Sequence, residues 1–245
     1  MLSRMDADHR QLRRLLVLNP KGGSGKSTLA TNLAAWCAQQ GHAPALLDMD
    51  PQGSSSRWLS KRGAEAAKVH GLRSYDLPSN VTRSFAMRPP PGTGRLVVDT
   101  PAAVPKEELR ELTRDAARII VPVLPSDIDI HAVTRCIADL LLVAKIPRGA
   151  GRIGIVANRV KPNTLVFRSL MRFLATLEIP VVGVLRDTQN YVRAFDQGLG
   201  IHELRGGTEQ KDIAQWAPLL DWVEHGRIPE QALTWEQPSV PCVLK

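Results

Sequence analysis

A glycine-rich stretch near the start of the sequence could bind a phosphate group. Residues 21–28 read Lys-Gly-Gly-Ser-Gly-Lys-Ser-Thr and stand between an apolar run and a helical pattern. Glycines let the backbone turn so that successive N–H groups converge on one anion, and the start of the next helix adds its positive end. Lys26 would reach the β- and γ-phosphates of a nucleotide, and the Ser27 hydroxyl would ligate Mg²⁺. A glycine-serine linker is the alternative, but the patterned elements on both sides argue against it.

Three aspartates follow apolar runs that have the length of strands. Asp48 and Asp50 come after residues 45–47, and Asp99 comes after residues 96–98. Carboxylates at strand ends can hold Mg²⁺ through water or position a water that attacks a phosphate. Each aspartate could instead cap a helix, but three of them near a phosphate loop favour a role in the chemistry.

Strands and helices alternate along most of the chain and must position the phosphate loop and the three aspartates. Strands are expected around residues 15–18, 45–47, 96–98, 119–121, 153–156 and 181–184, and helices around 26–40, 130–141 and 170–177. Apolar strands separated by amphipathic helices predict an α/β fold, a doubly wound and mostly parallel sheet with helices on both faces. Residues 63–94 are irregular and are expected to be a variable excursion. The predicted organisation is a basic leader (1–14), one domain (15–227) and a tail (228–245).

Composition excludes several classes of protein. The 245 residues are 43% apolar and 23% charged, which is ordinary for a globular chain. The three cysteines, Cys37, Cys136 and Cys242, are scattered, so neither a disulfide framework nor a cysteine metal site is expected. No apolar run approaches the length of a membrane helix, and no signal peptide is visible. A soluble, cytoplasmic protein is therefore predicted.

The sequence resembles the ParA/MinD superfamily of P-loop ATPases. Its phosphate loop has Pro20 in place of the usual first glycine and a second lysine, Lys21, as in the variant loop of that superfamily. The stretches Leu-Leu-Asp-Met-Asp-Pro-Gln-Gly (46–53) and Leu-Val-Val-Asp-Thr-Pro-Ala (96–102) resemble its second motif and its Walker B motif. The resemblance covers roughly residues 15–226 and is weakest between 63 and 94. It implies a P-loop NTPase fold and slow hydrolysis of ATP that depends on Mg²⁺.

The resemblance also implies roles for individual residues. Two ATP-bound subunits would close face to face as a homodimer, and Lys21 would reach the partner's nucleotide. Asp50 would position the attacking water, Asp48 would support it or the Mg²⁺ shell, and Asp99 would hold Mg²⁺ through water together with Ser27. The expected nucleotide contacts are Lys21, Gly22, Gly23, Ser24, Gly25, Lys26, Ser27, Thr28 and Asn158. Asn158 would read the adenine, although an asparagine at the start of a loop is also common.

Basic residues point to a polyanionic partner. The net charge is +8, and residues 145–211 hold eleven Lys and Arg against five Asp and Glu. Members of the family that resemble ParA bind double-stranded DNA nonspecifically through this region, so Arg168, Arg172, Arg186 and Arg193 are the candidate contacts. A solvated basic face remains the alternative for any single arginine. The last amphipathic segment is acidic, which disfavours the membrane-binding helix of MinD-like proteins.

The expected function is that of a ParA-type ATPase that distributes a cargo over the nucleoid. The cargo could be a plasmid, a chromosome region or a protein body such as a carboxysome, and a small adaptor or activator protein is an expected partner. The alternative is a MinD-like or other superfamily ATPase that acts in regulation or maturation without binding DNA. Iron–sulfur carriers of this superfamily are disfavoured because Cys136 stands alone in its helix.

Overall fold

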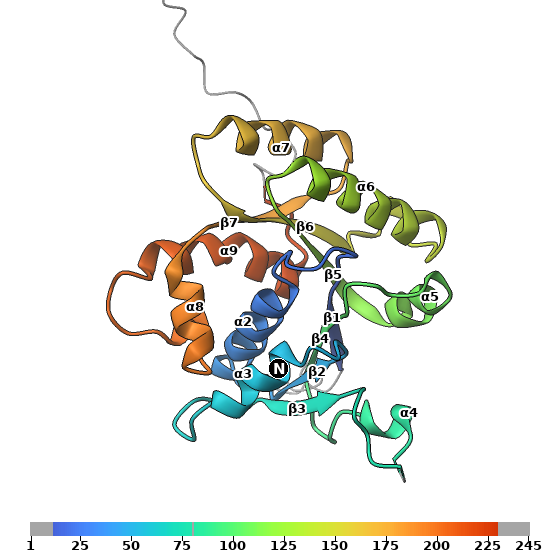
Figure 1. The fold of residues 1–245 in the computed structure, drawn as a ribbon, viewed down its shortest axis with the longest axis vertical. Coiled ribbons are helices and arrows are strands. Elements are labelled where there is room, and N and C mark those ends of the chain that lie inside the picture. The colour runs from blue at the N-terminus through green and yellow to red at the C-terminus, as the bar shows by residue number, and fades with distance from the viewer. Residues whose placement is uncertain (1–11, 80, 230–245) are drawn as a thin grey trace, which may run out of the picture.

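Seven parallel strands form one sheet in the order β3-β2-β4-β1-β5-β6-β7 (Figure 1). The computed structural model describes residues 12–79 and 81–229. The strands are β1 (Arg13–Val17), β2 (Pro44–Asp48), β3 (His70–Arg73), β4 (Arg95–Asp99), β5 (Ala116–Val123), β6 (Ile153–Val160) and β7 (Val181–Arg186). All pairings between described strands are parallel, which confirms the predicted sheet.

Helices cover both faces of the sheet. The helices are α2 (Lys26–Gln39), α3 (Ser54–Lys61), α4 (Arg83–Ala86), α5 (Lys106–Arg114), α6 (Asp127–Leu142), α7 (Leu165–Thr176), α8 (Gln189–Asp196) and α9 (Gln210–His225), with short 3₁₀ turns η1 (Arg148–Ala150) and η2 (Ile201–Glu203). Helices α2, α3, α8 and α9 lie on one side of the strands, and α5, α6 and α7 lie on the other (Figure 1).

Two apolar cores result from the alternation of side chains along each strand. Leu15 and Val17 of β1 point into the core beneath α2, whereas Leu16 and its neighbour Leu18 point into the core beneath α6 and α7. Successive residues of a strand face opposite sides, so a strand that is covered on both sides must be apolar at nearly every position. This explains why the expected strands read as continuous apolar runs.

One strand was not expected from the sequence. The excursion at residues 63–94 contributes β3, the edge strand that pairs with β2, together with the short helix α4. Three of its four residues are exposed, so β3 carries no apolar run to reveal it. The prediction of an irregular excursion was therefore wrong for residues 70–73.

The other predicted elements agree with the structure. The stripe of α9 is buried, with Trp216, Leu219 and Val223 at 0% exposure, so this helix packs on the core as expected. Cys37 and Cys136 are buried free thiols. Cys242, most of the leader and most of the tail lie outside the described residues. No helix among the described residues is long and apolar enough to span a membrane.

Candidate active site

The phosphate loop lies at the carboxyl end of β1, the central strand, and leads directly into α2. Gly23 and Gly25 have φ angles of 77° and 95°, which side chains with a Cβ rarely adopt. A Cβ on Gly25 would stand 2.1 Å from the Asn158 amide nitrogen, so this glycine also permits a close approach. A Cβ on Gly22 or Gly23 would meet nothing within 4 Å. The loop is thus closed on the side of β6 and open on the side where a phosphate would bind.

The remaining loop residues are arranged around the start of α2. Ser24 is buried and donates its hydroxyl to the Lys21 carbonyl oxygen at 3.2 Å. Ser27 and Thr28 stand in the first turn of α2 and are partly exposed. Their position at the positive end of a helix suits a bound anion.

The two lysines of the loop are placed differently. Lys26 is 6% exposed, and its ammonium donates to the Lys21 carbonyl oxygen at 3.0 Å. Burial lowers the pKa of Lys26, and the nearby carboxylates of Asp99 and Asp50 oppose that shift. The Lys21 ammonium instead lies 2.5 Å from the buried carboxylate of Asp129, in the first turn of α6.

Asp99 ends β4 and is completely buried. It accepts a hydrogen bond from the Ser55 hydroxyl at 2.6 Å, and its Oδ1 atom is buried with no partner among the described residues. Burial raises the pKa of this carboxyl to about 6, while hydrogen bonds from Ser55 and Ser27 oppose the shift. The unpartnered Oδ1 atom of Asp99 and the Ser27 hydroxyl are both hard oxygen donors. Mg²⁺ prefers donors of this kind. These residues fit a magnesium ion.

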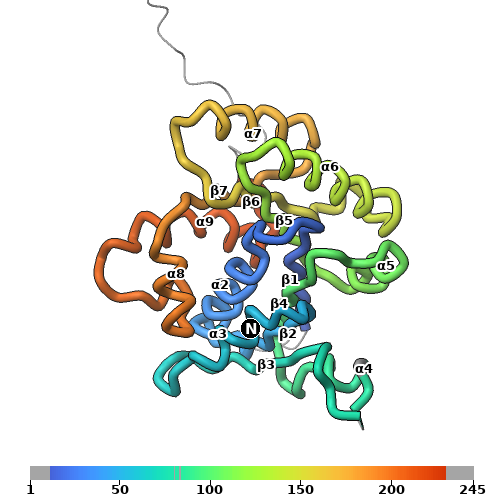
Figure 2. Tube along the Cα trace, viewed as in Figure 1, coloured from blue at the N-terminus to red at the C-terminus, as the bar shows by residue number. Residues whose placement is uncertain are grey.

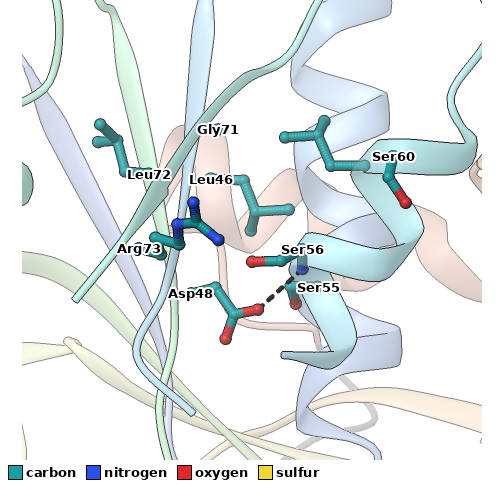
Figure 3. Close-up of a pocket in the computed structure, with 9 residues that line it drawn as sticks. Leu46, Asp48, Ser55, Ser56, Ser60, Gly71, Leu72 and Arg73 are labelled. Carbon is teal, nitrogen blue, oxygen red and sulfur yellow. Dashed lines mark hydrogen bonds between the residues drawn. The ribbon is translucent and has the colours of Figure 1, made fainter. Parts of the chain in front are cut away.

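Asp48 ends β2 beside Asp99 of the neighbouring strand β4, and several hydrogen bonds hold its side chain. Its carboxylate accepts hydrogen bonds from the backbone N–H groups of Ser56 at 2.8 Å and Asp50 at 3.1 Å, and from the Tyr75 hydroxyl at 3.0 Å. Figure 3 shows the Ser56 bond beside a cavity of about 300 Å³ between α3 and β3. Asp48 therefore holds the start of α3 and the backbone of Asp50, the capping arrangement that the sequence left as an alternative.

Asp50 is placed at the surface of the site. It follows β2 and is partly exposed, and its Oδ1 atom accepts the backbone N–H of Gln52 at 3.0 Å. Asp50 contributes a charge that acts on Lys26, so the two groups lie within electrostatic reach of each other. The structure thus brings Lys26, Asp50, Asp99 and the phosphate loop to one edge of the sheet.

Asn158 packs against the phosphate loop. It is 4% exposed, and its amide donates to the Ser24 carbonyl oxygen at 2.9 Å, while its own oxygen accepts the Arg159 N–H at 3.0 Å. These contacts tie β6 to the loop. The adenine contact that the resemblance implies stays a prediction.

The four candidate DNA contacts separate into two pairs. Arg186 is bonded to Asp212, which is 0% exposed, and Arg193 lies 3.5 Å from Glu209, which is 1% exposed. Arg168 and Arg172 are exposed on α7 and form no ion pair within residues 12–79 and 81–229. Of these four arginines, only Arg168 and Arg172 present positive charge to solvent without an acidic partner among the described residues.

Asp129, Ser55 and Tyr75 were not identified from the sequence. Ser126 caps α6 by accepting the Asp129 N–H, and a serine three residues before an acid is the pattern of a helix start. That pattern predicts a cap, but it does not predict the ion pair with Lys21, which joins residues 108 positions apart. Among the described residues, no cluster of three or more His, Cys, Asp or Glu could hold a metal.

The sequence is similar to those of known proteins. Residues 15–201 match the family described as the CobQ/CobB/MinD/ParA nucleotide binding domain. The chain is 30% identical over 205 residues to maintenance of carboxysome distribution protein A from Halothiobacillus neapolitanus, which covers 82% of this chain and 93% of that relative.

Two solved structures share the fold. Apo McdA from Cyanothece aligns with a TM-score of 0.65 at 16% identity, over 86% of this chain and 100% of that one. MinD from Pyrococcus horikoshii, complexed with Mg-ADP, aligns with a TM-score of 0.58 at 15% identity, over 88% of this chain and 97% of that one.

Proposed function

Because the chain belongs to the CobQ/CobB/MinD/ParA family of nucleotide-binding domains, we propose that it is a ParA-type ATPase that distributes a cargo along DNA. The observation that carries this proposal is the meeting of one phosphate loop, two lysines and two strand-end carboxylates, Asp50 and Asp99, at a single edge of the sheet. The chain also covers 93% of a relative named for maintaining the distribution of carboxysomes. A carboxysome or similar protein body is therefore our preferred cargo.

The residues of the site would together bind the phosphates, neutralise their charge and orient the attacking water. The N–H groups on the open side of the loop would bind the phosphates, and the Lys26 ammonium would exchange its carbonyl partner for phosphate oxygens. Mg²⁺, held by Ser27 and by Asp99 directly or through water, would neutralise charge on the phosphates. Asp50, with one oxygen held by Gln52 and partly exposed, would orient the attacking water. ADP with magnesium bound to the MinD of P. horikoshii supports this choice of ligands.

An ATP-dependent homodimer completes the proposal. Lys26 already serves the loop of its own subunit, so Lys21, whose ammonium contacts Asp129 here, would act on the nucleotide of a partner. Ile128, Leu165 and Val166 are 71%, 79% and 52% exposed at the starts of α6 and α7, on the same edge as the phosphate loop. Apolar side chains at that edge suit contact with a second copy of the chain.

DNA and an adaptor are the proposed macromolecular partners. Arg168 and Arg172 stand four positions apart on the exposed face of α7, and positive charge without base-reading groups favours contact with phosphates irrespective of sequence. A small protein that links the ATPase to its cargo or activates it would supply the remaining specificity.

Three measurements test the proposal together. We expect slow ATP hydrolysis that EDTA abolishes, a doubling of mass by light scattering with ATP, and equal binding to two unrelated duplexes with ATP but not with ADP. Hydrolysis and dimerisation without duplex binding would favour the MinD-like alternative. Duplex binding that is equal with ADP and ATP would contradict the positioning mechanism.

A further inference from the structure

The ion pair between Lys21 and Asp129 has a consequence for the nucleotide-driven dimer. We propose that Asp129 is a positioning residue that stores the Lys21 ammonium within its own subunit, so that Asp129 competes with the partner's nucleotide for Lys21. This inference rests on the proposed function, because it assigns a regulator to the lysine that would cross the dimer interface.

The geometry of the pair is that of a specific contact. The Lys21 ammonium lies 2.5 Å from Asp129 Oδ2, and the carboxylate is 1% exposed, whereas the lysine side chain is 31% exposed. A charge-assisted hydrogen bond to a buried carboxylate is about twice as strong as a neutral one. Figure 2 shows the blue turn after β1 close to the point where the green chain leaves β5 for α6.

The loop around Lys21 is fastened at two further points. The backbone N–H of Lys21 donates a hydrogen bond to Asn19 Oδ1 at 2.8 Å. The carbonyl oxygen of Lys21 accepts a hydrogen bond from the Lys26 ammonium at 3.0 Å. The backbone is therefore held, and only the side chain of Lys21 is free to choose between Asp129 and another anion. In this proposal the Lys21 ammonium leaves Asp129 when it extends across the interface to a phosphate.

Two other interactions stabilise the Asp129 carboxylate and do not depend on Lys21. The Ser126 hydroxyl also donates to Asp129 Oδ2, and the residue stands in the first turn of α6, where the helix dipole favours a negative charge. These two interactions remain after Lys21 departs. They lower the cost of leaving a buried carboxylate without its counter-ion, although Oδ1 has no partner among the described residues.

The consequence is a threshold for dimerisation. Two Lys21–Asp129 pairs must open, one in each subunit, before both lysines can reach phosphates. A triphosphate carries enough charge to compete with one carboxylate, and Asp129 therefore raises the ATP concentration that dimerisation needs. Ile128 stands beside Asp129 and is 71% exposed, so the turn that stores the lysine also faces the surface proposed to meet the second copy.

The decisive experiment measures the ATP concentration for half-maximal dimerisation on an Asp50→Ala background, which prevents turnover. We expect Asp129→Asn to lower that concentration about tenfold, because a charge-assisted pair of this kind is worth about one decade in an equilibrium constant. Asp127→Asn is the matched control, since Asp127 is an exposed acid two positions earlier in the same turn. It should leave the ATP requirement unchanged.

A second arm shows whether Asp129 acts through Lys21. The double variant Lys21→Met/Asp129→Asn should not show the lower ATP requirement for dimerisation that is expected of Asp129→Asn. If the double and the single variant dimerise at the same ATP concentration, the inference is wrong. Without nucleotide, Lys21→Met should lower the Tm by about 3 °C, since it leaves a buried carboxylate unpaired, and adding Asp129→Asn should restore most of that loss. Additive Tm changes would show that the pair does not form.

The possible failures are distinguishable. If the Asp50→Ala protein dimerises with ATP and Asp129→Asn needs as much ATP or more, the storage role is wrong and the proposed function stands. If neither protein dimerises at saturating ATP, the proposed function is wrong and the inference fails with it.

Discussion

The hydroxyl of Ser55 donates to the carboxylate of Asp99 at 2.6 Å and thereby joins the first turn of α3 to the end of β4. Both side chains are 0% exposed. The bond occupies one oxygen of Asp99, so that the other, Oδ1, keeps its lone pairs for a ligand. Because α3 follows the loop that holds Asp50, this bond also fixes the spacing between the proposed magnesium ligand and the proposed water-positioning group.

Removing this hydroxyl should weaken the magnesium site. We expect Ser55→Ala to raise the Mg²⁺ concentration for half-maximal ATP hydrolysis about tenfold, since outer partners of metal ligands typically contribute that much to affinity. Ser60→Ala is the control, because Ser60 is exposed on the same helix and donates to the Arg57 carbonyl oxygen. An unchanged Mg²⁺ requirement in Ser55→Ala would show that Asp99 does not depend on this bond.

Asp48 and Asp50 should fail in different ways when replaced. Asp50→Ala should abolish hydrolysis while ATP binding and the Tm stay close to those of the parent protein, because the side chain is partly exposed and has few contacts. Asp48→Ala should destabilise the fold by about 2 kcal/mol, since it leaves three partly buried donors without their acceptor. Turnover assays and urea unfolding of both variants check this. Turnover by Asp50→Ala at the parent rate would remove Asp50 from the mechanism.

Duplex binding should depend on the α7 arginines. The double variant Arg168→Glu/Arg172→Glu should weaken binding to all duplexes alike and reduce the slope of log K against log salt by about 2. Lys68→Glu/Arg110→Glu makes the same change of charge at exposed residues outside α7 and should have the smaller effect. Gel shifts at several salt concentrations decide the matter, and equal losses in both double variants would show a general charge effect only.

Arg186 should behave as a structural residue. Arg186→Glu would place a carboxylate beside the fully buried Asp212 and leave two acids without a cation, at a cost of about 3 kcal/mol or more. Its Tm should therefore fall well below that of the Arg168→Glu/Arg172→Glu variant. A normal Tm with lost duplex binding would instead return Arg186 to the DNA contacts.

His202 should make the fold sensitive to acid. Both ring nitrogens are buried without partners in the described part of the chain, and burial lowers the pKa of His202 to about 4. The unfolded chain binds the proton near pH 6.5, so the stability contributed by the neutral ring is present above that pH. It is lost as the pH falls toward 4, by about 3 kcal/mol for a shift of this size.

Unfolding of His202→Phe tests that acid sensitivity. The His202 and Trp216 rings meet edge-on, with their centroids 5.6 Å apart. The His202→Phe variant keeps an aromatic ring at this position but cannot bind a proton. Its stability relative to the parent should therefore rise as the pH falls from 6.5 to 4. A constant difference over that range would show that His202 is accommodated in its charged form.

Much of the fold could be predicted from local pattern. The strand ends at Asp48 and Asp99, the loop from Lys21 and the helix from Lys26 are each encoded by a few adjacent residues, because apolar runs and glycines act over short distances. The edge strand β3 could not be predicted in this way. Its order comes from pairing with β2 and from Leu59, which packs so closely against Gly71 that a Cβ there would stand 2.2 Å from it.

Residue types and their spacing along the chain were enough to predict the family, the parallel sheet and the residues of the phosphate loop. The partners of the charged and polar residues became visible only in the folded chain: Asp129 for Lys21, Ser55 for Asp99, and buried acids for Arg186 and Arg193. Charges and hydrogen bonds act over a few ångströms in space. The residues that compensate a charge therefore belong to whichever strands and helices the fold places beside it, and no local pattern names them.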